Sequence, residues 1–224
     1  MNKDFQRFAV KGCGISSNTL HGYENSIVNY VNPHVLEQRS MNVTSLDIMS
    51  RLQMDRILFL GDTINSDVAN IITAQLLWLE QQSDADICLY INSPGGSVSD
   101  GLQIIDTMDF IRPNVSTTCM GLAASMGAVI GAHGTKGKRF IIPHGRFMIH
   151  QPLMQGGHGS QQASDIQIMA EQILKTKEEL YNLLCNDSNL SMEEIVKMGD
   201  RDCWLTADEA ISYGFIDHKI EKRG

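Results

Sequence analysis

Met120-Gly-Leu-Ala-Ala-Ser-Met-Gly-Ala128 lies at the centre of the architecture that the sequence predicts. The residues before it, Val115-Ser-Thr-Thr-Cys119, have the β-branched character of a strand, and small apolar residues suited to a closely packed helix follow Ser125. A strand that turns into a helix at a serine places the hydroxyl on a sharp corner, beside backbone N–H groups without intrahelical partners. With Ala123 in place of the first glycine, the pattern narrowly misses the nucleophile elbow G-x-S-x-G. A serine that merely caps the helix is the alternative interpretation.

Strand-like and helix-like segments alternate on either side of this stretch. Buried strands are predicted at residues 57–60 and 87–91, and each is followed by apolar residues at helical spacing. The pattern Ser97-Val-Ser-Asp100 opens the second of these helices. Further along, residues 139–142 and 146–150 are expected to form a hairpin, and a long helix begins near Ser164. The alternation predicts an α/β fold with βαβ crossovers.

The bulk properties are those of a globular domain with a net negative charge. The chain has 224 residues, of which 42% are hydrophobic and 20% charged, and its formal net charge is −8. This charge argues against a nucleic-acid or anionic-membrane partner, which would require a basic face. Neither a signal peptide nor a membrane span is recognisable. The five cysteines are widely spaced and form no C-x-x-C pair, which favours a reducing, cytoplasmic location over disulfides or a zinc site.

The first 32 residues are rich in Gly, Ser and Asn and show no clear periodicity. We expect them to form a flexible extension, and ordered structure to start near Pro33. Residues 33–224 are then expected to form a single domain.

A second stretch with candidate chemistry is Asn92-Ser-Pro-Gly-Gly-Ser-Val98, which is expected between a strand and a helix. Gly95 and Gly96 can adopt backbone conformations closed to other residues, and their free N–H groups could cradle an oxyanion or a phosphate. The stretch lacks the G-K-[ST] ending of a P-loop, so a nucleotide is not expected. A simple tight turn is the alternative.

The third stretch, Met148-Ile-His-Gln-Pro152, places His150 at the end of a predicted strand. A histidine in such a position can be a general base or a hydrogen-bonded structural residue. A carboxylate partner could come from Asp200 or Asp202, which share a short loop between two helices with capping boxes. Spacing does not choose between these two, and both could be solvated surface charges.

Taken in order, these stretches resemble the proteolytic subunits of the Clp protease, the ClpP family. The resemblance covers roughly residues 33–220 and keeps the family's order and nearly its spacing. The matching segments are S-P-G-G at 93–96, M-G-L-A-A-S-M-G-A at 120–128, G-K-R-F at 137–140, M-I-H-Q-P-L at 148–153 and R-D-C-W-L-T-A-D-E-A at 201–210.

The resemblance implies a serine endopeptidase that works through an acyl-enzyme. Ser125 would be the nucleophile, His150 the general base and Asp202 the carboxylate that orients the imidazole. The backbone N–H groups of Gly96 and Met126 would form the oxyanion hole. A substrate strand would pair with the backbone on both sides of the serine. These substrate-binding positions are Gly96, Ser97, Val98 and Leu153.

The implied fold is the crotonase-like ββα superhelical repeat, from which a helix and strand handle protrudes. The helix at 164–185 and the Gly/Gln-rich segment before it match this handle, although residues 154–160 make the segment a few residues longer than usual. Subunits of the family form a homo-oligomer of two stacked heptameric rings around a closed chamber. By the same resemblance, residues 1–32 of each subunit would be a self-cleaved propeptide or an axial gating loop.

The implied partner is an AAA+ unfoldase ATPase of the ClpX, ClpA or ClpC type, which feeds unfolded polypeptides into the chamber. It would dock at Tyr90 and Phe110, for which an ordinary place in the core is the alternative. The resemblance implies no cofactor on this chain, because the unfoldase is the subunit that uses ATP.

Three other classes of protein are alternatives. A crotonase-type acyl-CoA hydratase or isomerase would share the fold and the paired N–H groups, but would not need Ser125 and His150 together. A catalytically silent ClpP-like ring subunit would be expected to lack one of the three catalytic residues, and none is missing. A signal-peptide-peptidase-like serine–lysine enzyme would need a lysine base and usually a membrane anchor.

Overall fold

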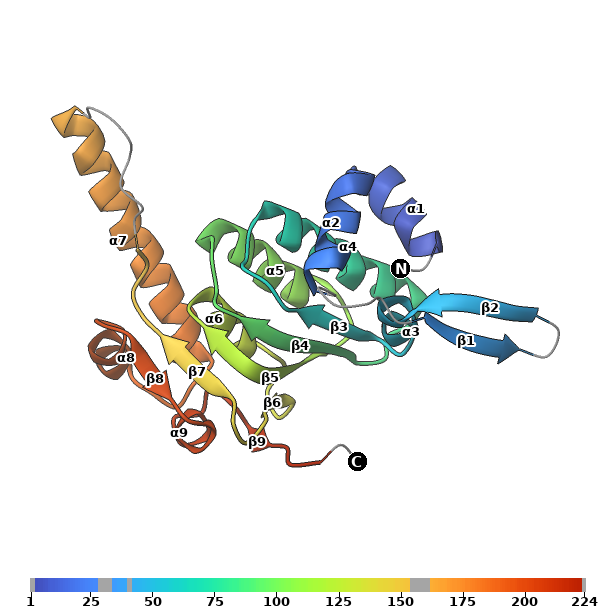
Figure 1. The fold of residues 1–224 in the computed structure, drawn as a ribbon. Helices are drawn as coiled ribbons and strands as arrows, with labels where there is room; N and C mark the ends of the chain where they lie inside the picture. Colours follow the sequence, from blue (N-terminus) through green and yellow to red (C-terminus); the bar gives the residue numbers. More distant parts are fainter. Residues whose placement is uncertain (1–2, 28–33, 40–41, 154–161, 223–224) are drawn as a thin grey trace.

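The computed structural model describes residues 3–27, 34–39, 42–153 and 162–222, and in this part seven strands form one sheet (Figure 1). The strand order is β3-β4-β5-β6-β9, with β7 beside β5 and β8 beside β7. All neighbours are parallel except β7 and β8. The strands are β3 (Ile57–Leu60), β4 (Ile87–Ser93), β5 (Val115–Ala124), β6 (Arg139–Ile141), β7 (Arg146–Ile149), β8 (Cys203–Leu205) and β9 (His218–Lys219). The predicted α/β fold is confirmed.

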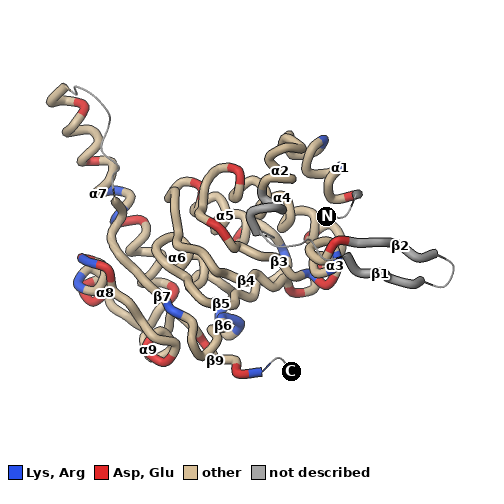
Figure 2. Tube along the Cα trace, viewed as in Figure 1, with Lys and Arg blue, Asp and Glu red and all other residues tan. Residues whose placement is uncertain are grey.

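Helices α4 (Ser66–Gln82) and α5 (Val98–Phe110) lie side by side against the sheet (Figure 1). β3, β4 and β5 contain no charged residue and are tan in Figure 2, which fits strands whose residues are mostly buried. Ser97 caps α5 as predicted, and Asn65 caps α4. Near the edge of the sheet, β1 (His34–Arg39) and β2 (Asn42–Asp47) form a separate antiparallel pair that leads into α3 (Ile48–Met54).

The predicted hairpin of residues 139–142 with 146–150 is wrong. β6 and β7 do not pair with each other; both run parallel to β5 and lie one after the other along its length. Gly121 lies between the two segments of β5 that pair with β6 and β7; its φ is +84°, and a Cβ there would lie 2.8 Å from the side-chain oxygen of Asn92. The chain therefore runs in the same direction in β6 and in β7. The Pro-His-Gly sequence at 143–145 is typical of a turn that reverses the chain, but here it connects two strands of the same direction.

Where the sequence predicted a flexible extension in residues 1–32, the structure places two helices in the part that it describes. Helices α1 (Lys3–Lys11) and α2 (Ser17–Ile27) pack on α4. Phe5 is fully buried, and the rings of Phe5 and Phe8 lie 6.4 Å and 5.6 Å from that of Trp78. The helical spacing of these phenylalanines is a signal that the Gly- and Ser-rich composition concealed. Pro33, where ordered structure was expected to start, lies outside the described residues.

The long helix predicted near Ser164 is present as α7 (Ala163–Asn186), and its first half stands away from the rest of the fold (Figure 1). In its second half Leu180 and Leu184 are buried, whereas Ile166 near its start is 51% exposed. The segment at 154–160, expected to be longer than in the family, lies outside the described residues. In the described part, no helix combines the length and apolarity needed to cross a membrane.

Helix α6 (Met126–Ala132) is held at its C-terminal end by charged side chains. The guanidinium of Arg139, only 5% exposed, donates to both carboxylate oxygens of Asp217 and to the carbonyl oxygens of Ala132 and Asp187. It thereby joins the end of α6, the end of α7 and the start of β9.

Beside this arginine, His133 follows α6 directly and contacts two carboxylates. Its Nδ1 lies 2.7 Å from Asp187 Oδ2 and its Nε2 lies 3.1 Å from Asp109 Oδ1. Because a neutral imidazole donates from one nitrogen only, both contacts are satisfied when the ring is protonated. Burial favours the neutral ring, but Asp187 and Asp109 outweigh it and raise the pKa of His133.

We expect His133→Ala to destabilise the protein more at acidic than at alkaline pH. A raised pKa in the folded state means that the stabilisation is complete below the pKa of the unfolded histidine and is lost as pH rises through the folded value. Unfolding by urea at about pH 5.5 and about pH 8.5, at one protein concentration, measures the difference from wild type. Exposed His144→Ala is the control, and a pH-independent difference for His133→Ala would contradict the expectation.

Candidate active site

Ser125 occupies a sharp backbone corner between β5 and α6. Its φ of 53° and ψ of −126° lie in a region that residues other than glycine rarely adopt. The corner is held by its own N–H, which donates to the carbonyl of Met148 at 2.8 Å, and by its carbonyl, which accepts from Ala128 and Val129 in the first turn of α6. The strand–serine–helix geometry predicted from sequence is present, and Ser125 makes no side-chain capping bond to α6. This geometry is that of a nucleophile elbow.

Gly95 and Gly96 have no room for a side chain, because the backbones of Ile64 and of Ala124–Ser125 approach them closely. A Cβ on Gly95 would lie 2.6 Å from the Ala124 carbonyl oxygen and from Ser125 Cβ. A Cβ on Gly96 would lie 2.1 Å from the carbonyl oxygen of Ile64, and its φ is +152°. Ile64 exchanges backbone bonds with Gly95 and Ser97, which fixes the loop against the elbow. The glycine pair is thus part of the serine site as well as a strand-to-helix turn.

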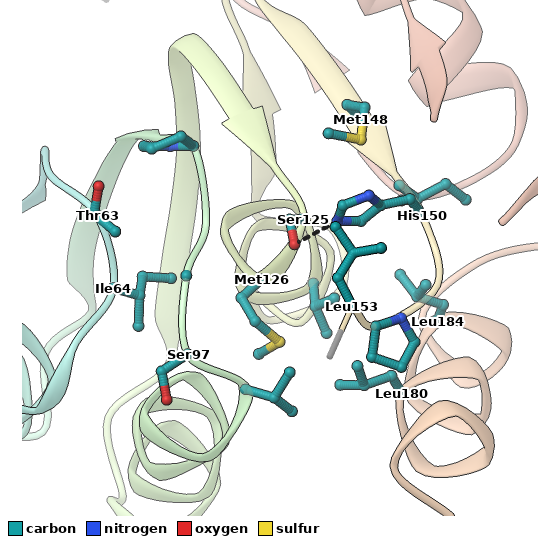
Figure 3. A pocket seen from close by; sticks show the side chains of 16 residues that line it. Thr63, Ile64, Ser97, Ser125, Met126, Met148, His150, Leu153, Leu180 and Leu184 are labelled. Atoms are coloured by element: carbon teal, nitrogen blue, oxygen red, sulfur yellow. Dashed lines mark hydrogen bonds between the residues drawn. The ribbon is translucent and has the colours of Figure 1, made fainter. Parts of the chain in front are cut away.

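Ser125, His150 and Asp202 meet although they come from three parts of the chain. His150 follows β7, and its Nε2 lies 2.9 Å from Ser125 Oγ (Figure 3). Its Nδ1 lies 3.0 Å from Asp202 Oδ1. The carboxylate in contact is therefore that of Asp202; the side chain of Asp200 is 65% exposed and lies 3.9 Å from Arg201.

The pair of His150 and Asp202 is placed by the sheet. Because β7 and β8 are antiparallel and Ile149 is opposite Cys203, the residues just beyond each strand face each other. The His150 side chain is 15% exposed, but that of Asp202 is 60% exposed. The contact between carboxylate and imidazole therefore borders solvent and contributes little binding energy of its own.

Two backbone N–H groups beside Ser125 are free to bind an oxyanion. Met126 is the first residue of α6, so its N–H has no acceptor within the helix. In the described part of the chain, neither this N–H nor that of Gly96 donates a hydrogen bond to the protein. Both residues line the same pocket as the serine hydroxyl.

The pocket next to the serine has a volume of about 600 Å³ and mainly apolar walls (Figure 3). Ser97 and Val98 line it on the α5 side, and Leu153, 76% exposed, lies on the opposite side past His150. Chain segments thus flank Ser125 on both sides, as the substrate-binding prediction requires. The remaining lining residues are Thr63, Ile64, Pro94, Gly96, Met126, Val129, Met148, Ile149, Pro152, Leu180 and Leu184.

The structure does not bring Tyr90 and Phe110 together within one chain. Tyr90 is half-buried on β4, stacks on Phe59 at 5.3 Å and lines a hollow of about 430 Å³. Phe110 ends α5, is 78% exposed and lines a different hollow of about 610 Å³ with Leu77 and Leu102.

Sequence reasoning missed Gln151 and Lys177 as residues close to this site. The side chain of Gln151 donates to the Asp200 carbonyl oxygen, and Lys177 donates to Gln151. The adjacency of Gln151 to His150 was a weak signal for the first contact. Nothing in the sequence pattern indicated that a lysine in the middle of α7 would reach the loop.

Comparison with known proteins gives a consistent result across almost the whole chain. The Clp protease family model matches residues 39–223. The ATP-dependent Clp protease proteolytic subunit of Porphyromonas gingivalis is 47% identical over 222 residues, which cover 98% of each chain. The subunit of the same description from Bacteroides fragilis (strain YCH46) is 49% identical over 98% of this chain and 99% of its own. That of Lactococcus lactis subsp. cremoris is 50% identical over 86% of this chain and 96% of its own. The chain belongs to the Clp protease family.

Proposed function

We propose that this chain is the serine endopeptidase subunit of an ATP-dependent protease and cleaves polypeptides through an acyl-enzyme on Ser125. The observation that carries the proposal is the continuous contact from Ser125 Oγ through the His150 ring to Asp202, at 2.9 Å and 3.0 Å. A serine hydroxyl becomes a useful nucleophile only when a hydrogen-bonded base accepts its proton. Relatives described as proteolytic subunits support the same activity.

In the proposed reaction, His150 Nε2 removes the proton of Ser125 Oγ as the oxygen attacks the scissile carbonyl carbon. The resulting oxyanion accepts hydrogen bonds from the N–H groups of Gly96 and Met126. Protonated His150, stabilised by the Asp202 carboxylate, then gives its proton to the leaving amine as the C–N bond breaks. His150 then removes a proton from water, whose oxygen attacks the acyl carbon. The bond between that carbon and Ser125 Oγ breaks, His150 returns the proton to Oγ, and the second product leaves as a carboxylic acid.

Substrate recognition in this proposal depends on the main chain. An extended peptide between Gly96–Val98 and Leu153 would form backbone hydrogen bonds on both sides, which gives affinity with little demand on substrate sequence. The apolar pocket beside Ser125 would receive one side chain of the substrate.

The wider assembly in the proposal is a homo-oligomer of two stacked heptameric rings in the cytoplasm, served by an AAA+ unfoldase of the ClpX, ClpA or ClpC type. The relatives' description as ATP-dependent supports an ATPase partner. Tyr90 and Phe110 would contribute to its docking surface, each from its own hollow. The peptidase chemistry itself uses only protein groups, so no cofactor is proposed for this chain.

Two alternative functions are not favoured. A silent ring subunit would not be expected to retain all three side chains in hydrogen-bonding order. A crotonase-type hydratase or isomerase has no need of a serine in contact with a histidine, and the relatives are described as protease subunits.

Ser125→Ala is expected to abolish peptide hydrolysis and labelling by a fluorophosphonate probe, because both require the hydroxyl. In proteases with such a triad, loss of the nucleophile typically costs about 10⁶-fold in kcat. Hydrolysis of a fluorogenic peptide and intact-protein mass spectrometry measure the two effects. Retention of wild-type hydrolysis in Ser125→Ala would refute the proposed function.

Asp202→Asn is expected to lower kcat by about 10⁴-fold, because the amide stabilises neither the correct tautomer nor the imidazolium. Asp200→Asn is the matched control two residues away, and we expect its kcat to stay within about threefold of wild type. Steady-state hydrolysis of one peptide by both variants makes the comparison. A larger loss in Asp200→Asn would transfer the role to that residue.

The assembly is expected to have a mass of about fourteen protomers by light scattering. The free half of α7 exposes the apolar side chains of Ile166, Ile168 and Leu174 by 51%, 64% and 63%, and contact with a second ring would bury apolar side chains of this kind. Ile168→Asp is therefore expected to shift the mass toward single rings of about seven protomers. A persistent monomer in the wild-type protein would contradict the assembly.

A further inference from the structure

Gln151 is bonded to three partners on two other segments of the chain. Its backbone N–H donates to the Gly199 carbonyl oxygen at 2.6 Å. Its side-chain Nε2 donates to the Asp200 carbonyl oxygen at 2.8 Å, and its Oε1 accepts from Lys177 Nζ at 2.9 Å. Every group of the amide side chain that faces the protein therefore has a partner of the correct polarity.

These bonds lie on one side of the contact between His150 and Asp202. On the other side, the ladder of β7 and β8 ends at the pair Ile149 and Cys203. Gln151 is one residue beyond His150, and Asp200 is two residues before Asp202. The loop that carries the Asp202 carboxylate is thus bonded to the His150 segment on both sides, by the β7–β8 ladder on one side and by the Gln151 hydrogen bonds on the other.

Lys177 and the Asp200 carbonyl oxygen together fix which way the Gln151 amide faces. An amide can be rotated by half a turn with little change in shape, so its orientation depends on its partners. The ammonium group only donates, which places Oε1 toward α7 and leaves Nε2 for the Asp200 carbonyl. Lys177 is itself placed over the buried ring of Tyr181, with Nζ 5.4 Å from the ring centroid.

We propose that Gln151 and Lys177 are positioning residues, which keep the Asp202 loop in contact with His150 by means of one oriented amide. This inference rests on the proposed function and deepens it. The Asp202 side chain is 60% exposed, so its contact with the imidazole is too weak to order the loop unaided. A displacement of about 1 Å in a supporting residue can cost up to 10²-fold in rate.

The test compares kcat and KM of a fluorogenic peptide across substitutions in the intact assembly. Lys177→Met removes the donor and is expected to lower kcat about tenfold with KM within about twofold, because the amide loses its anchor on α7 but the pocket is unchanged. Lys177→Arg keeps a donor and is expected to restore most of kcat. Lys175→Met is the matched control: Lys175 lies two residues earlier on α7 and lines a hollow toward α5, and its kcat is expected to equal that of wild type.

Gln151→Glu separates the two bonds of the amide. The carboxylate can still accept from Lys177 but cannot donate to the Asp200 carbonyl, so kcat is expected to fall about tenfold or more. Urea unfolding of each variant accompanies the kinetics, so that a general loss of stability is recognised.

The decisive readout is non-additivity with Asp202. If Lys177 acts through the carboxylate, Lys177→Met is expected to cause no further loss in an Asp202→Asn background, measured as the rate of fluorophosphonate labelling of Ser125. A tenfold loss that persists in that background would overturn the positioning role, as would an equal loss in Lys175→Met. Failure of the proposed function would look different, since wild-type protein would then show no hydrolysis dependent on Ser125.

Discussion

The pairing of β5 with two successive neighbours, β6 and then β7, is the constraint on which the site depends. The first half of this strand pairs with β4 and β6, and its last three residues pair with β7. Because Ala124 is opposite Met148 in a parallel pair, Ser125 and His150 emerge from neighbouring strands at the same edge of the sheet. Between these two pairing segments the register of β5 with β4 shifts, and Gly121 there adopts a positive φ of +84°.

The parts of the site differ in how firmly they are held. Ser125 is enclosed by backbone on several sides, by the Met148 carbonyl and by Gly95. His150 is mostly buried, whereas Asp202 borders solvent. Rigidity is therefore greatest at the nucleophile and least at the carboxylate, and auxiliary hydrogen bonds are concentrated where the side chain itself is poorly enclosed.

Much of this arrangement could be predicted from sequence because the signals were local. Strand–turn–helix patterns located Ser125, Gly96 and the start of α5, and the capping boxes at Ser191 and Thr206 open α8 (Met192–Met198) and α9 (Ala207–Ser212) as expected. The predictions failed where the local structure depends on contacts with segments that are distant in the sequence. A turn sequence after β6 does not reveal that β5 has room for two successive neighbours, and Gly- and Ser-rich composition concealed the contact of Phe5 with Trp78. The choice between Asp200 and Asp202 likewise depends on the β7–β8 register, which spacing alone does not give.

The backbone corner at residue 125 has a consequence for how such a site is maintained over time. A side chain in this region of φ and ψ costs on the order of 1–3 kcal/mol, and glycine would adopt the same corner without that cost. The residue that the chemistry requires is therefore one that folding alone disfavours. If only thermal stability were selected and not catalytic turnover, residue 125 would tend to become glycine, and the chain would fold well but lack the hydroxyl.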